Sequence, residues 1–125
     1  MKVSTTSVSD LLQLQDGVPP AACPSRIMLD HVTSRWGVLL LVALSEETLR
    51  WGELRRRVEG ISEKMLAQTL RILEADGFVH REAQPTIPPH VEYSLTDRGR
   101  EIAALLIPLM QWIVGHASEV LVAGG

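Results

Sequence analysis

Two short helical patterns separated by three residues constrain the fold of this chain more than any other feature. The first pattern, over residues 51–58, places Leu54 and Val58 on one helical face and arginines on the other. The next three residues break the pattern, and Gly60 suits a left-handed helix end. Ser62 then suits the start of a second helix, because its hydroxyl can accept a backbone N–H. Two helices joined by a short, glycine-containing turn form a helix-turn-helix motif.

The second helix of this motif is predicted over residues 63–76, with a leucine side and a polar side. The leucine side is defined by helical spacing: Leu66, Leu70 and Leu73. Steps of 100° per residue place on the opposite side the residues Lys64, Gln68 and Arg71. We expect Gln68 to read a base edge and the two cations to meet phosphate or guanine. The alternative interpretation is a charged helix face that only meets solvent.

The flanking segments predict a mainly α-helical domain with a small β-hairpin. A helix is expected over residues 24–33, and a second helix, from Trp36, is apolar all round and expected to be buried on every side. Strands are predicted over 78–83 and 90–95, joined by a proline-rich loop, which together describe a wing. Thr96 is expected to cap a long final helix. Its apolar surface requires a partner.

The chain of 125 residues is long enough for one such domain and too short for two. We predict a flexible N-terminal arm over residues 1–20, where serine, threonine, glycine and proline are frequent. Residues 21–125 are predicted to form a winged helix-turn-helix domain with a C-terminal dimerisation helix.

The net charge of −3 by itself argues against nucleic acid as a partner, but its distribution does not. Residues 50–71 hold six basic and three acidic residues, a local net charge of +3. Salt screens charges beyond about 8 Å, so a basic face can act on an acidic protein. Two hypotheses follow: a regulator that binds double-stranded DNA, and a winged-helix module that binds protein without DNA.

Arg55, Arg56 and Arg57 also lie in this basic segment. Three consecutive helical residues cannot face one way, so we expect one or two of them, with Arg55 and Arg56 as the candidates, to contact phosphate.

Several other functions find no support in the residues. The single cysteine excludes an intrachain disulfide and a cysteine-based zinc cluster, and the four histidines show no metal-ligand spacing. No catalytic constellation or phosphate loop is visible, so we predict neither an enzyme nor a cofactor. The apolar runs fall short of the roughly 18 residues of a membrane helix. Without a secretory signal in the first residues, we expect a cytoplasmic protein.

Residues 23–112 resemble the HxlR-type winged helix-turn-helix transcription regulators. The resemblance rests on ordered short motifs: Cys23-Pro24, Arg35-Trp36, Glu53-Leu54-Arg55, Gly60-Ile61-Ser62, Lys64 with Leu66, Leu70-Arg71-Ile72-Leu73-Glu74, Asp76-Gly77, Pro88-Pro89, Val91-Glu92-Tyr93-Ser94-Leu95-Thr96 and Gly99. It implies a homodimer through the first and last helices, with the 63–76 helix in the major groove and the wing on the flanking backbone. A bacterial or archaeal repressor or activator is implied, and we predict a repressor on a pseudo-palindromic operator.

Two departures from the family pattern affect the predicted interface. His90 follows the wing prolines where the family commonly has a basic residue, so the wing's phosphate contact becomes weaker and pH-dependent. Ser34-Arg35 stands where Gly-Lys is typical, which keeps the positive charge.

Cys23 precedes Pro24 at a predicted helix start, where the helix dipole favours the thiolate. Relatives of this type are thought to sense oxidants or electrophiles through a cysteine here, so the resemblance implies a response to an effector, either a small molecule or an oxidant. The alternative is that Cys23 is a small buried hydrophobic residue.

Overall fold

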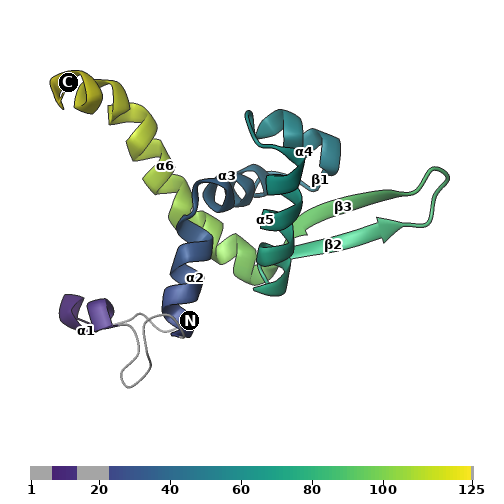
Figure 1. The fold of residues 1–125 in the computed structure, drawn as a ribbon, viewed down its shortest axis with the longest axis horizontal. Helices are drawn as coiled ribbons and strands as arrows, with labels where there is room; N and C mark the ends of the chain where they lie inside the picture. The colour runs from purple at the N-terminus through teal and green to yellow at the C-terminus, as the bar shows by residue number, and fades with distance from the viewer. Residues whose placement is uncertain (1–6, 14–22, 125) are drawn as a thin grey trace.

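The computed structural model describes residues 7–13 and 23–124. The elements follow in the order α1 (Val8–Gln13), α2 (Pro24–Thr33), α3 (Arg35–Leu44), β1 (Leu49–Arg50), α4 (Trp51–Arg57), α5 (Glu63–Ala75), β2 (Val79–Gln84), β3 (His90–Leu95) and α6 (Asp97–Gly124). The β2–β3 hairpin projects from one side of the helices, and the C-terminal part of α6 projects from another (Figure 1). The predicted α-helical fold with a hairpin wing is therefore confirmed.

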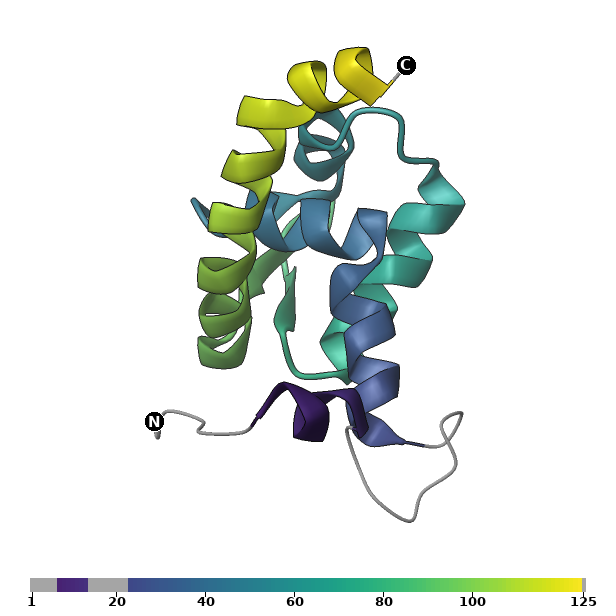
Figure 2. The ribbon, with the colours of Figure 1, turned by 90° about the vertical axis from the view of Figure 1, so that its left-hand side faces the viewer.

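Helix α3 lies at the centre of the helical layer and contacts α2, α5 and α6 (Figure 2). Leu40 and Leu41 are 0% exposed because they face the core that these helices share. The prediction that this helix is buried on every side is wrong on one side. Val38 and Leu39 are only partly buried and line a groove against α6.

The turn between α4 and α5 matches the predicted helix-turn-helix in detail. Leu54 and Val58 are buried, as their spacing predicted. Gly60 has a φ of +89°, a conformation that side chains with a Cβ rarely adopt. Ser62 Oγ accepts a hydrogen bond from the Met65 backbone N at 3.1 Å, which starts α5.

The end of α5 explains why β2 begins one residue later than predicted. Phe78 N donates to Leu73 O and Gly77 N donates to Glu74 O, with Gly77 at a φ of +85°. This pair of bonds is a Schellman motif, which satisfies the last carbonyls of the helix. Phe78 belongs to the helix end, so the strand starts at Val79.

The wing is part of an antiparallel sheet with strand order β1-β3-β2. Strand β1 was not predicted, because two residues are too short to show alternation. It pairs with β3 through Leu49 opposite Tyr93. In the hairpin, Arg81 is the register partner of Tyr93, so both side chains lie on the same face of the sheet.

Helix α6 is capped as predicted, because Thr96 Oγ1 accepts a hydrogen bond from Gly99 N at 3.0 Å. Its first half packs on the domain through the buried Ala103 and Leu106. By length and composition alone, the stretch Asp97–Leu121 could cross a membrane, and α2 with α3 would qualify only as one span bent by 71°. The sequence analysis did not predict this property of α6, because it considered only the lengths of uninterrupted apolar runs.

Ser7 and helix α1 lie within the predicted N-terminal arm, and residues 1–6 and 14–20 of that arm lie outside the described residues. The exposed side chains of α1 include Val8, Leu11 and Leu12. The arm therefore stays a prediction.

Candidate nucleic-acid interface

The two sides of α5 are separated as the periodicity predicted. The leucine side is buried, with Leu66 and Leu73 at 0% exposure and Leu70 at 3%. The opposite side is exposed along the helix, and its polar side chains are Lys64, Gln68 and Arg71. Burial of the leucines therefore orients a cationic and amide-bearing stripe outward.

The three arginines of α4 differ in their partners. Arg57 lies 2.9 Å from Glu47 and 3.9 Å from Glu46, so its charge is balanced within the chain. Arg55 lies 3.7 Å from Glu63, and both side chains are well exposed. Arg56 makes no ion pair with any residue that the structure describes. Exposed pairs are weak, so Arg55 and Arg56 are both available to a polyanion.

His90 lies near the tip of the wing, where it is the first residue of β3 and pairs with Gln84, in an acidic setting. Its Nδ1 is 3.1 Å from Thr86 Oγ1, and its Nε2 is 4.0 Å from a Glu92 carboxylate oxygen. Glu92 pairs in register with Glu82, so two carboxylates face each other across the hairpin. A phosphate contact by His90 stays a prediction, and this setting weakens it.

Arg81 is a candidate interface residue that the sequence analysis did not select. It lines a cavity of ≈ 430 Å³ between α5 and the wing together with Arg71, Trp51 and Tyr93. Neither Arg71 nor Arg81 makes an ion pair with any other described residue. The alternation of side chains along β2 could have indicated Arg81. Val79 and Arg81 lie on the same face of the strand, and Val79 is buried whereas Arg81 is exposed.

Cys23 is 2% exposed at the start of α2. Its side chain makes no capping hydrogen bond to that helix. Within the described residues, no three His, Cys, Asp or Glu side chains gather closely enough to hold a metal ion.

An apolar groove runs between α3 and α6. It has a volume of ≈ 390 Å³, and its lining includes Val38, Leu39, Leu106, Leu109 and Ile113. Beyond it, large apolar side chains of α6 are exposed: Leu105, Trp112, Val114, Val120 and Leu121. This surface contrasts with the polar stripe of α5.

A helix-turn-helix whose second helix exposes a polar stripe, followed by a two-stranded wing, defines a winged helix-turn-helix protein. The family model of the HxlR-like helix-turn-helix matches residues 31–120, and the chain belongs to this family.

Individual relatives agree with this assignment. The HTH-type transcriptional regulator YtfH of Escherichia coli strain K12 is 53% identical over 117 residues, 93% of each chain. The solved structure of the transcriptional regulator ytfH from Salmonella typhimurium is 52% identical, with a TM-score of 0.77 over 82% of this chain and 92% of that chain. The redox regulator HypR in its oxidised form is 38% identical, with a TM-score of 0.69 over 74% of this chain and 96% of its own.

Proposed function

We propose that this protein is a DNA-binding transcriptional regulator that inserts α5 into the major groove of its operator. The observation that carries the proposal is the exposure of Lys64, Gln68 and Arg71 on the side of α5 opposite its buried leucines. Side chains of these types read base edges or contact phosphates from a groove-bound helix. The names of the relatives, which are transcriptional regulators, support the same function.

Within this proposal, the side chains act in two groups. Gln68 reads a base edge, while Arg71 and Lys64 bind guanine or phosphate. Arg55, Arg56 and Arg81 hold the flanking backbone from α4 and the wing, with a weaker contribution from His90. Ser62 accepts the Met65 N–H, which leaves its hydroxyl hydrogen for a phosphate at the start of α5.

We further propose that the protein acts as a homodimer on a pseudo-palindromic operator, as a repressor. Exposed apolar side chains on α6 and on α2, including Leu109, Trp112 and Met28, support a second copy as the partner. The first half of α6 is packed on a folded domain, which favours this partner over a membrane. The two α5 helices then lie about 34 Å apart, one turn of DNA.

An oxidant response through Cys23 is a second candidate function, favoured by the similarity to the redox regulator HypR. Cys23 is buried, so an oxidant reaches its sulfur only if the start of α2 opens. Diamide, which is reduced to the hydrazine as it joins two thiols in a disulfide, would link Cys23 of one copy to Cys23 of a second copy. This treatment is expected to weaken operator binding by the unsubstituted protein and to leave Cys23→Ser unaffected. Equal affinities before and after treatment exclude this response.

A salt series tests the DNA-binding proposal. Binding of the purified protein to DNA from upstream of its own gene is measured at increasing salt, in the presence of competitor DNA. We expect Arg71→Ala to weaken specific binding by about 1 to 3 kcal/mol and Lys64→Ala to reduce the salt slope by about one unit. The control Arg57→Ala removes an arginine that is already paired with glutamates.

The opposite outcomes are equally informative. Equal losses of DNA affinity in the Arg71→Ala and Arg57→Ala variants would indicate that the main DNA contact is not on α5. No binding at low salt would favour the winged-helix protein-interaction module.

A further inference from the structure

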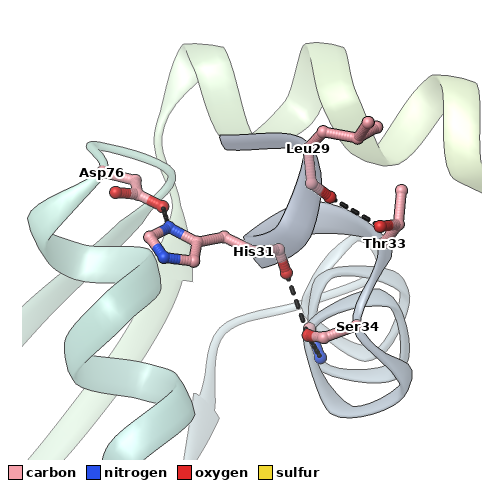
Figure 3. A network of polar contacts seen from close by, with 6 residues as sticks. Leu29, His31, Thr33, Ser34 and Asp76 are labelled. Atoms are coloured by element: carbon pink, nitrogen blue, oxygen red, sulfur yellow. Dashed lines mark hydrogen bonds and ion pairs between the residues drawn. The ribbon is translucent and has the colours of Figure 1, made fainter. Parts of the chain in front are cut away.

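One partly buried polar contact joins α2 to the end of α5. His31 Nδ1 lies 2.6 Å from Asp76 Oδ2, although the two residues are 45 positions apart in the chain (Figure 3). The two side chains are only 28% and 20% exposed. A carboxylate can only accept a hydrogen bond, so His31 Nδ1–H is the donor.

His31 also takes part in the corner between α2 and α3. Its backbone oxygen accepts a hydrogen bond from Ser34 Oγ at 2.9 Å, and Ser34 Oγ accepts one from Gly37 N at 3.1 Å (Figure 3). The same residue thus contacts α5 through its ring and the start of α3 through its carbonyl. His31 therefore ties α2 to both α3 and the end of α5 by direct hydrogen bonds.

The position of Asp76 is unfavourable for α5 taken alone. Asp76 is the C-cap of α5, where the negative end of the helix dipole repels a carboxylate. Its own N–H already bonds to Ile72 O. The stability of α5 alone does not explain an aspartate at this position, whereas the contact with His31 does.

We propose that His31 and Asp76 are positioning residues that set the angle of α5 relative to the dimer face on α2. This inference rests on the proposed function. Helix α2 also exposes three consecutive apolar side chains, of which Leu29 lies on the face opposite His31: Ile27, Met28 and Leu29. If a second copy covers them, the His31–Asp76 contact determines the separation of the two α5 helices, and so the operator spacing.

The test measures affinity as a function of half-site spacing. A preferred operator is selected from random DNA with the unsubstituted full-length protein, then lengthened and shortened by one base pair between half-sites. Each change moves one half-site by about 3.4 Å along the axis and about 34° around it. We expect the unsubstituted protein to lose affinity about tenfold at either altered spacing.

Substitution of Asp76 is expected to flatten this dependence. Asp76→Ala should bind the matched operator about five- to tenfold more weakly, and its loss at altered spacings should fall to about threefold or less. Asp76→Asn keeps an acceptor oxygen for His31 and should restore most of the spacing preference. Asp30→Ala, an exposed carboxylate neighbouring His31 on α2, is the matched control and should behave as the unsubstituted protein.

A measurement on the unsubstituted protein without DNA tests the His31–Asp76 contact directly. Its result does not depend on whether any variant folds. Nitrogen-15 spectra of the histidine rings should show the His31 proton on Nδ1 in the unsubstituted protein. A proton on Nε2 alone, or an unchanged spacing profile in a folded Asp76→Ala variant, overturns the positioning role. If the unsubstituted protein selects no DNA, the proposed function and this inference both fail, whereas selection with an unchanged profile overturns only the inference.

Discussion

Helices α5 and α6 each bury one part of their surface in the same core, but they present opposite chemistry to the outside. Helix α5 exposes Lys64, Gln68 and Arg71, whereas α6 exposes residues such as Leu105 and Val114, at 71% and 75%. The exposed side of α5 is therefore compatible with solvent and with DNA, whereas that of α6 is an apolar surface of the kind that marks an interaction site.

This difference separates two surfaces of one small domain that would bind partners of different chemistry. Charged and amide groups bind DNA through contacts that salt weakens, while an apolar helix face associates through burial that salt does not weaken. The core between them, centred on Leu40 and Leu41 of α3, keeps the two surfaces apart.

The largest expected effect comes from the buried side of α5. Leu66→Ala should lower the free energy of unfolding by about 2 to 5 kcal/mol, because Leu66 is 0% exposed and a cavity would remain. Urea unfolding followed by circular dichroism measures the change. Gln68→Ala on the exposed side is the control and should stay within about 0.5 kcal/mol. Similar losses in the two variants would contradict the separation of the two sides.

A negative charge placed in the groove between α3 and α6 tests whether the apolar surface of α6 forms the proposed dimer contact. Leu109→Glu should raise the dissociation constant of the proposed homodimer at least about 30-fold, because a carboxylate in the groove would have to be desolvated when a second copy covers it. Sedimentation equilibrium measures the constant. Ile87→Glu, at a fully exposed apolar position in the wing, should leave the dimer intact. A dimer that survives Leu109→Glu would place the interface elsewhere.

The smallest effect is expected at the start of α5. Ser62→Ala removes the acceptor for the Met65 N–H and should cost about 1 kcal/mol of folding stability. Ser62→Asp supplies another acceptor and should recover most of this loss. Thermal unfolding of the two variants makes the comparison, and equal melting temperatures would show that the cap contributes little.

The elements that were predicted well depend on neighbours within a few residues. The spacing of Leu66, Leu70 and Leu73, the positive φ of Gly60 and the Ser62 cap are all local properties. Strand β1 was missed because Leu49 and Arg50 carry no pattern of their own and pair only because β3 lies beside them. The start of β2 was misplaced because Phe78 belongs to the end of α5.

The candidate interface was predictable only in part for the same reason. The stripe on α5 follows from periodicity, whereas the convergence of Arg81 with Arg71 depends on how the wing lies against α5. The pairing of Arg57 with Glu47 and the partial exposure of Val38 also depend on neighbours from other elements.

The order of residues alone determined which side of each helix is apolar, where the helix-turn-helix bends and which residue types α5 can present, because these depend on helical periodicity and short-range hydrogen bonds. Only the tertiary structure decided which charges are neutralised within the chain, which apolar side chains stay uncovered and which distant residues meet. Contacts such as His31 with Asp76 form because packing brings separate helices together, and no local pattern records that distance.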